Sequence, residues 1–176
     1  MDNYNLKLLL KINNLVGRHK WLDVFGCSGA EWAIFGALGW FLTASLINGL
    51  PDKQLAFIPL LFFAFSWVIG WFLSLLIGMI VQEKRPYITN PEVKILFKPL
   101  MSWKSFPSDH ALIAFLLFFL GLVFNLPFVW ALLILALWVS WGRMYVGLHY
   151  PLDILGGLTL AGLISVFVYY LYLIIF

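Results

Sequence analysis

Most side chains that could perform chemistry fall into three short strings near the ends of apolar stretches. These strings are Arg85-Pro86, then Pro107-Ser108-Asp109-His110, and finally a spaced set made of Arg143, His149 and Asp153. Together they hold two guanidinium groups, two imidazoles and two carboxylates. Cations combined with acid–base groups in this way are typical of a site that binds and cleaves a phosphate.

The spaced set is suited to nucleophilic catalysis by histidine. Pro151 fits the first turn of a helix, where its missing N–H costs nothing, and this places Asp153 in the same turn. His149 precedes Asp153 by four residues, so the carboxylate can hold one imidazole nitrogen and leave the other one to attack. Arg143 adds a permanent cation whose planar fork matches phosphate oxygens.

The second string predicts an anion-binding helix start. Pro107 can open a helix and leave the amides of the next three residues facing outward, where helix N-termini bind anions. The Ser108 hydroxyl adds a donor, Asp109 contributes its amide, and His110 is placed to protonate a leaving oxygen, a role typically worth ~10²–10⁴-fold in rate. With Arg85 as the second guanidinium, these groups can transfer a phosphoryl group without a metal ion.

Each string is weak evidence on its own. A single histidine at a helix start is usually a cap or an interface residue, and ionisable residues at the ends of membrane spans often extend harmlessly to the interface. The three strings together favour a site, because they hold two of the three histidines. The third, His19, lies in a basic N-terminal segment, and we interpret it as structural.

These strings must be positioned by an all-α membrane helix bundle. Hydrophobic residues make up 63% of the 176 residues and charged residues 11%, against ~25% in soluble domains, so lipid must solvate much of the surface. Five stretches approach the ~20 apolar residues of a spanning helix. They are roughly 27–49, 55–81, 107–125, 127–146 and 151–175. With five spans, the polar segments 82–105 and 142–153 lie on the same side of the membrane.

The first twenty residues predict an amphipathic helix that lies in the membrane interface. One helical stripe is basic and another apolar, with Lys7, Lys11 and Arg18 on the first and Leu8, Ile12 and Leu15 on the second. A cleaved signal peptide is the alternative, but Lys11 interrupts the apolar run and no small-residue cleavage site follows.

The composition also limits the partners. A formal net charge of +3 without a block of like charge gives no indication of nucleic-acid binding, and the single Cys27 excludes an internal disulfide. No repeat or second domain is visible, so residues 1–176 are expected to form one domain. The expected partners are membrane lipids and a lipid phosphate substrate. No cofactor is expected, and the oligomeric state stays open.

The order of the three strings resembles the type-2 phosphatidic-acid phosphatase superfamily over nearly the whole chain. Its motifs are Arg-Pro, Pro-Ser-x-His and Arg-x5-His-x3-Asp, which begin here at Arg85, Pro107 and Arg143. The resemblance implies an all-helical membrane fold, a phosphohistidine intermediate and no metal. It assigns the nucleophile to His149, its orientation to Asp153, the general acid to His110, and phosphate binding to Arg85, Ser108 and Arg143.

Two positions depart from the superfamily pattern. A lysine usually stands seven residues before the arginine of the first motif, where this chain has Gly78. A serine usually precedes the arginine of the third motif, where this chain has Gly142. Gly142 removes one hydroxyl, whereas Gly78 removes a cation from the phosphate site. Lys84 is a candidate replacement for that cation, although on a helix it would point about 100° away from Arg85.

The stretches 105–111 and 146–153 resemble the bacterial undecaprenyl-diphosphate phosphatases of this superfamily. That group also lacks the lysine and carries two glutamates, which Glu31 and Glu83 match here. A charged residue at the centre of a span costs ~2.5–3.5 kcal/mol, which makes Glu31 a functional candidate. The alternative is that Glu31 lies in the interface and pairs with a nearby Arg or Lys.

The charge distribution and the resemblance disagree on orientation. Of the eleven Lys and Arg residues, only Lys53 lies on the side opposite the site, so the positive-inside rule places the site in the cytoplasm. The resemblance implies a site on the outer face of the bacterial plasma membrane. We follow the resemblance on this point.

The expected function is hydrolysis of undecaprenyl diphosphate, or another polyprenyl diphosphate, to the monophosphate. Phosphatidate, phosphatidylglycerol phosphate and lipid A phosphate are alternative substrates. A protein of a different class, a transporter or lipid-binding membrane protein with a degenerate site, is the other alternative, and Gly78 is the argument for it.

Overall fold

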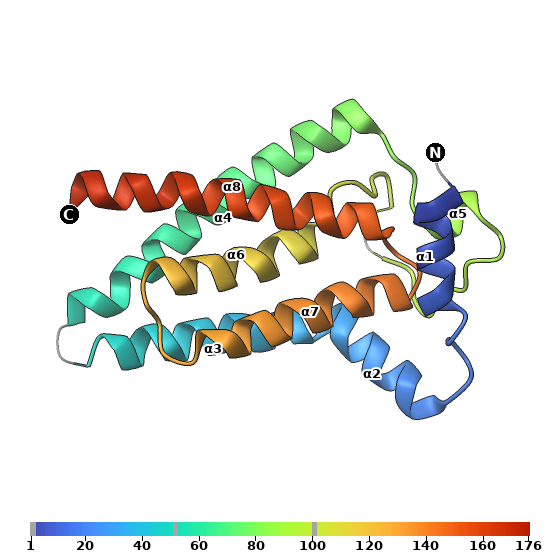
Figure 1. Cartoon of the computed structure of the whole chain (residues 1–176), viewed down its shortest axis with the longest axis horizontal. Coiled ribbons are helices and arrows are strands. Elements are labelled where there is room, and N and C mark those ends of the chain that lie inside the picture. The colour runs from blue at the N-terminus through green and yellow to red at the C-terminus, as the bar shows by residue number, and fades with distance from the viewer. Residues whose placement is uncertain (1–2, 51–52, 100–101) are drawn as a thin grey trace.

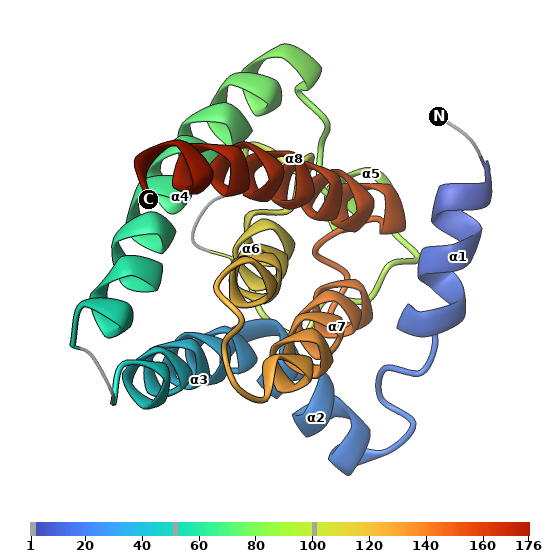
Figure 2. The ribbon, with the colours of Figure 1, turned by 60° about the vertical axis from the view of Figure 1, so that its left-hand side comes forward.

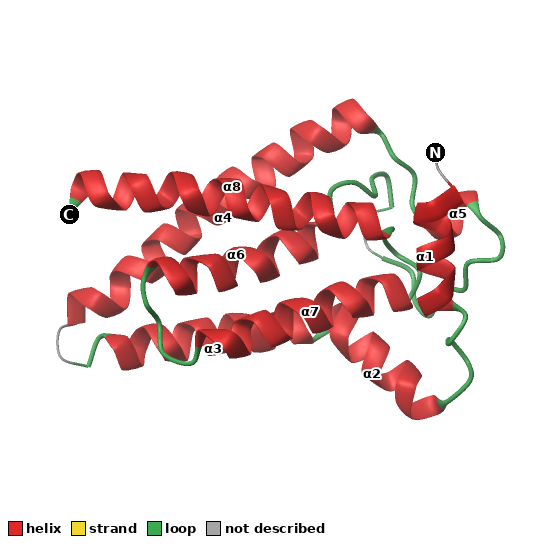
Figure 3. Cartoon of the chain, viewed as in Figure 1, coloured by secondary structure: helices red, strands yellow, loops and turns green. Residues whose placement is uncertain are grey.

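The computed structural model describes residues 3–50, 53–99 and 102–176, which form helices and loops (Figure 3). Eight helices follow one another in these residues: α1 (Asn3–Asn13), α2 (Lys20–Glu31), α3 (Ala33–Asn48), α4 (Lys53–Val81), α5 (Pro86–Thr89), α6 (Asp109–Val123), α7 (Val129–Tyr145) and α8 (Pro151–Ile175). The chain is therefore an all-α membrane helix bundle, as its sequence predicts.

Helix α6 lies at the centre of the bundle. It packs on α3, α4, α7 and α8, and Figure 2 shows these four helices around it. Its residues are apolar on every side, which is typical of a helix with no polar surroundings. Leu116, Leu117 and Leu120 are fully buried. The first turn of α6, which carries part of the predicted site, is therefore held on several sides.

The helices follow the order of the five predicted spans, with differences in length and shape. Helices α4 and α8 are long and apolar enough to cross a bilayer, and α2 with α3 adds a third crossing if the bent pair is one span. Helices α6 and α7 have 15 and 17 residues. They are shorter than predicted because Pro107 and Ser108 precede α6 in a loop and residues 124–128 form the turn before α7.

The predicted first span, 27–49, is not one straight helix. The chain breaks at Trp32, and α2 and α3 meet there at an angle of 54°. This break lets α2 leave the bundle axis and cross the end of α7, which Figure 1 shows below the bundle. The bend also brings the end of α2 next to the predicted site.

Helix α1 covers only residues 3–13 of the predicted amphipathic segment, and its buried stripe differs from the prediction. The buried positions are Asn5, Leu9 and Asn13, whereas Leu8 is exposed. Asn13 donates its Nδ2 to the carbonyls of Lys94 and Tyr145 at 2.8 Å each. A polar side chain is buried here because it satisfies two backbone groups and ties the long loop to α7.

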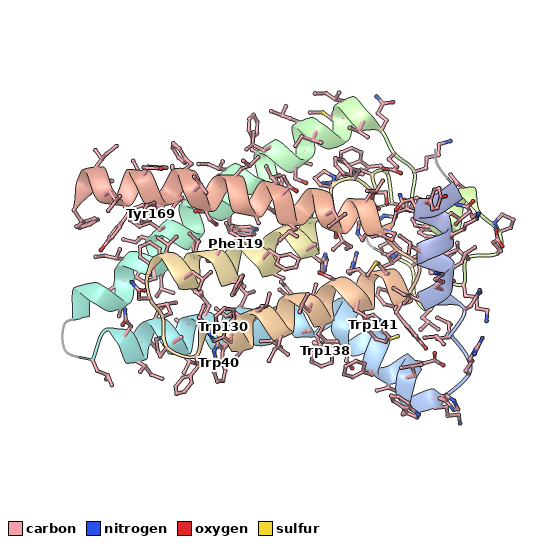
Figure 4. The ribbon with its side chains drawn as sticks, in the orientation of Figure 1. Trp40, Phe119, Trp130, Trp138, Trp141 and Tyr169 are labelled. Carbon is pink, nitrogen blue, oxygen red and sulfur yellow. The ribbon has the colours of Figure 1, made fainter. Side chains whose placement is uncertain are left out.

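Aromatic side chains occupy both ends of α7 (Figure 4). At the first end, Trp130 packs on Phe118 of α6, and the Trp40 Nε1 of α3 donates to the Phe128 carbonyl at 3.4 Å. Trp138, towards the other end, donates its Nε1 to the Phe25 carbonyl of α2 at 3.1 Å. Rings with one polar contact and an apolar face suit the two interfaces of a membrane.

Helices α2 and α7 cross so closely that Gly142 has no room for a side chain. A Cβ at this position would lie 2.5 Å from the Ala30 backbone nitrogen and 2.7 Å from the Gly29 carbonyl carbon. Because these atoms belong to a helix backbone, they cannot move aside as a side chain can. The close crossing of α2 and α7 therefore requires a glycine at position 142, where the superfamily usually has a serine.

The variant Gly142→Ser restores the residue that the superfamily usually has, and we expect it to destabilise this chain by about 1–3 kcal/mol, the usual cost of overpacking. Thermal unfolding in detergent measures the change. The matched control is Gly39→Ala, because an added Cβ at Gly39 meets nothing within 4 Å. A native melting temperature for Gly142→Ser would contradict the packing argument.

Candidate active site

The loops that follow α4 and α7 meet the start of α6 at one end of the bundle (Figure 1). Arg85, His110, Arg143 and His149 line one pocket there, with a volume of about 490 Å³. Asp153 lies directly behind His149. The three predicted strings, which are up to 68 residues apart, therefore form a single site.

The two ring nitrogens of His149 face different groups. Nδ1 lies 3.4 Å from Asp153 Oδ2, whereas Nε2 lies 3.4 Å from Arg85 Nη1 and 3.4 Å from Arg143 Nη2. The carboxylate thus faces one side of the ring, although Nδ1 makes no hydrogen bond in the described residues, and the guanidinium groups face the other side. A phosphate held by the two guanidinium forks would lie against Nε2, which is the geometry that nucleophilic attack requires.

Both guanidinium groups are buried and anchored by backbone carbonyls. Arg85 Nη1 donates to the Leu148 carbonyl at 3.3 Å, and Arg143 Nη1 donates to the Ala30 carbonyl at 3.2 Å. The Nε atoms of both arginines have no hydrogen-bond partner in the described residues. Buried donors without a partner are rare in proteins, so both forks retain capacity for the oxygens of an anion.

Asp153 is held by strong contacts of its own. Its Oδ2 accepts from the Ser105 hydroxyl at 2.5 Å and from the Tyr150 amide at 2.7 Å. The second contact caps the first turn of α8, as the position of Pro151 predicts. Sequence reasoning did not identify Ser105 as part of the site, because a serine in a loop has no distinguishing pattern.

The start of α6 differs from the prediction. The helix begins at Asp109, and Ser108 is its N-cap, with a hydroxyl that accepts from the Ala111 amide at 3.5 Å. The Ser108 amide, which we expected to face an anion, donates instead to the Asp153 carbonyl at 3.0 Å. Ser108 therefore links α6 to α8, whereas Asp109 and His110 line the pocket.

The expectation that Lys84 supplies the missing cation is wrong in this structure. Helix α4 ends at Val81, and the chain turns away from the helix at Gln82, whose φ of 51° is left-handed, so residues 82–85 do not continue the face of α4. Lys84 and Glu83 consequently line a neighbouring pocket beside Tyr150. Lys98, which the sequence did not indicate, lines the active-site pocket instead.

Glu31 is the last residue of α2 and lines the active-site pocket, although it is exposed. The alternative interpretation, an ion pair with a nearby Lys or Arg, is not found among the described residues. Glu31 is therefore placed at the entrance of the site rather than within the bundle.

An apolar pocket of about 260 Å³ continues from the polar one. Both pockets are lined by Phe35, Trp67, His110 and Ile113. The second pocket adds aliphatic and aromatic side chains from α3 and α4 and almost no polar surface. A ligand with a charged head and an apolar tail fits this arrangement.

Comparison with known proteins agrees with the fold and identifies the family. Residues 59–175 match the PAP2 superfamily. The chain is 32% identical over 170 residues to the bacitracin transport permease protein BcrC of Bacillus licheniformis, covering 94% of this chain and 79% of that one. It is 30% identical over 161 residues to the undecaprenyl-diphosphatase BcrC of Bacillus subtilis, covering 92% and 80%. The crystal structure of Aquifex aeolicus LpxE matches with a TM-score of 0.72 and 26% identity, covering 95% of each chain.

The chain therefore belongs to the PAP2 superfamily, and it is a membrane phosphatase of lipid substrates. The order and spacing of its three motifs and its helical fold agree with this assignment.

The surroundings of His149 should keep its ring neutral. Burial lowers the pKa of His149 well below the usual histidine value of 6.5, and the charges of Arg143 and Arg85 lower it further. We expect His149 to stay neutral as the pH falls through 6.5 and to protonate only at lower pH. NMR titration of isotope-labelled histidines in detergent measures this, with His149→Gln to assign the resonance.

Two variants make the titration specific. Arg143→Gln removes a nearby cation and should raise the pKa of His149, whereas Lys84→Gln lies outside the pocket and should leave it unchanged. A native midpoint at pH 6.5 or above would show that the described surroundings do not control the ring.

Proposed function

We propose that the protein hydrolyses a polyprenyl diphosphate, of the undecaprenyl diphosphate type, to the monophosphate without a metal ion. The observation that carries this proposal is the position of His149 Nε2, 3.4 Å from a nitrogen of each guanidinium, in a pocket that continues into an apolar one. The name of the Bacillus subtilis relative, an undecaprenyl-diphosphatase, supports the substrate class.

The first step transfers the terminal phosphoryl group to His149. Arg85 and Arg143 bind its oxygens, and Nε2 attacks the phosphorus in line with the leaving oxygen. The P–O bond to the lipid monophosphate breaks while His110 donates a proton to that oxygen. Asp153 stabilises the positive charge that develops on the imidazole of His149, whose Nδ1 faces it at 3.4 Å.

The second step hydrolyses the phosphohistidine. His110, now without its proton, accepts one from a water molecule that attacks the phosphorus. The Nε2–P bond breaks, inorganic phosphate leaves, and His149 returns to its neutral form. The neutral ring is required for the next attack, and the two buried arginines favour it electrostatically.

A diphosphate suits the charges around the pocket. Arg85 and Arg143 account for one phosphate, and Lys98, an exposed residue, lines the same pocket. Lys98 can therefore bind the second phosphate of a diphosphate, whereas a lipid monophosphate has no second phosphate for it to bind. The apolar pocket beside Phe35 and Trp67 leaves the start of an isoprenyl tail in contact with hydrocarbon.

Replacement of the nucleophile tests the mechanism directly. With a substrate labelled at its terminal phosphate, and with EDTA present, we expect an acid-labile phosphoenzyme that is absent in His149→Ala. Asp153→Asn should lower the rate by at least about tenfold, because the ring loses its orienting charge. Near-native turnover by a folded His149→Ala variant would show that the nucleophile is another residue.

Metal dependence is tested with the same assay. Loss of all turnover in EDTA, with recovery on adding a divalent ion, would contradict the metal-free step.

Substrate preference is tested by a comparison in one detergent at one pH. We expect kcat/KM to be about tenfold higher for a polyprenyl diphosphate than for phosphatidate or phosphatidylglycerol phosphate, which corresponds to ~1.4 kcal/mol. Lys98→Ala should reduce diphosphate turnover more than monophosphate turnover. Lys84→Ala is the matched control, because Lys84 is an exposed lysine of the neighbouring pocket. Equal turnover of all lipids, unchanged by Lys98→Ala, would reject the diphosphate substrate and leave the histidine mechanism intact.

A further inference from the structure

A lysine from the loop before α6 fills the space beside Gly78. A Cβ on Gly78 would lie 2.6 Å from Lys104 Cδ and 3.3 Å from the Trp103 ring. The Lys104 side chain therefore crosses α4 at this glycine, and a side chain on residue 78 would collide with it. Lys104 is only 3% exposed, so its stem cannot move into solvent without opening this contact.

The buried ammonium of Lys104 is fully paired. Its Nζ donates to Asp109 Oδ1 at 2.7 Å and to the Ser74 hydroxyl at 2.5 Å. The Ser74 hydroxyl in turn donates to the same Asp109 oxygen at 2.5 Å. Removing an ammonium from water costs several kcal/mol unless it gains an opposite charge and hydrogen bonds, and this cluster provides both.

Asp109 connects the cluster to the active site. Its carboxylate lies in the first turn of α6 and lines the same pocket as Arg85, Arg143 and His149. An uncompensated carboxylate at this place would repel the phosphate that the two arginines attract. Its contacts with Lys104 and Ser74 neutralise this charge and hold it towards α4.

We propose that Lys104 is a positioning residue of the phosphatase site, which compensates the charge of Asp109 and ties the start of α6 to α4. Gly78 leaves the room that the lysine side chain needs. The proposal rests on the proposed function of this pocket. It also accounts for the superfamily lysine that is missing at position 78, because the ammonium reaches that place from the loop.

The charge of Lys104 can be removed while most of its stem is kept. For Lys104→Met we expect kcat/KM to fall by about tenfold or more, mainly through a higher KM, because the carboxylate then opposes phosphate binding. In an Asp109→Asn background, Lys104→Met should lower kcat/KM by less than about threefold, because no carboxylate is left whose charge the lysine must compensate. Lys84→Met, outside the pocket, is the matched lysine control and should leave KM unchanged.

Moving the lysine provides an independent test. Residue 78 lies one turn after Ser74, and side chains on a helix lean towards its N-terminus, so a lysine at 78 can reach Ser74 and Asp109. The double variant Gly78→Lys/Lys104→Ala should recover kcat/KM to within about threefold of the native chain. Gly78→Lys alone should lower the melting temperature, because both stems compete for one space.

Three results would overturn the proposal: an unchanged KM in Lys104→Met, an equal loss of kcat/KM with and without the Asp109 carboxylate, or unchanged vanadate binding in Lys104→Met. Vanadate binding, followed by quenching of pocket tryptophans such as Trp67 and Trp71, separates this outcome from failure of the proposed function. If the native chain hydrolyses none of the lipids but Lys104→Met weakens vanadate binding, the proposed function fails and the positioning role stands. If vanadate binding is unchanged in Lys104→Met, the positioning role is wrong.

Discussion

Two buried guanidinium groups beside one imidazole nitrogen impose the main constraint on this structure. Arg85 and Arg143 are 6% and 4% exposed, and each charge removed from water costs several kcal/mol. Neither is paired with a carboxylate in the described residues, and both are anchored by backbone carbonyls. The fold therefore holds two like charges close together, an arrangement that becomes favourable when an anion lies between them.

Much of the surrounding architecture follows from this constraint. The carbonyl that anchors Arg143 belongs to Ala30, near the end of α2, and it is within reach because α2 crosses α7 at Gly142. The carbonyl that anchors Arg85 lies in the loop just before His149. The helices and the loop that anchor Arg85 and Arg143 thus also position the imidazole of His149. The distance between this nucleophile and a bound phosphate therefore depends on how the helices cross, and not only on the side-chain conformations.

Local patterns predicted the parts of the site that have local causes. The spacing of His149 and Asp153, with the proline that begins α8 between them, was sufficient to predict that the carboxylate faces one nitrogen of the imidazole. Contacts over long sequence distances have no such pattern, which is why Ser105 beside Asp153 was not predicted. Lys84 was proposed for the phosphate site because it is adjacent to Arg85, but the turn at Gln82 after the end of α4 directs it to the neighbouring pocket. Lys104, which we propose as the substitute for the superfamily lysine at position 78, could not be identified from the sequence either. Its position depends on the space that Gly78 leaves in the folded structure.

The continuity between the polar pocket and the apolar pocket determines how substrate concentration should be understood. A lipid whose tail stays in hydrocarbon encounters the pocket by diffusion within one leaflet. Its effective concentration is then the number of molecules per unit of membrane area, not per volume of solution. Adding detergent or inert lipid dilutes such a substrate even when the total amount is constant, so a Michaelis constant for this protein has physical meaning only as a mole fraction of the surface.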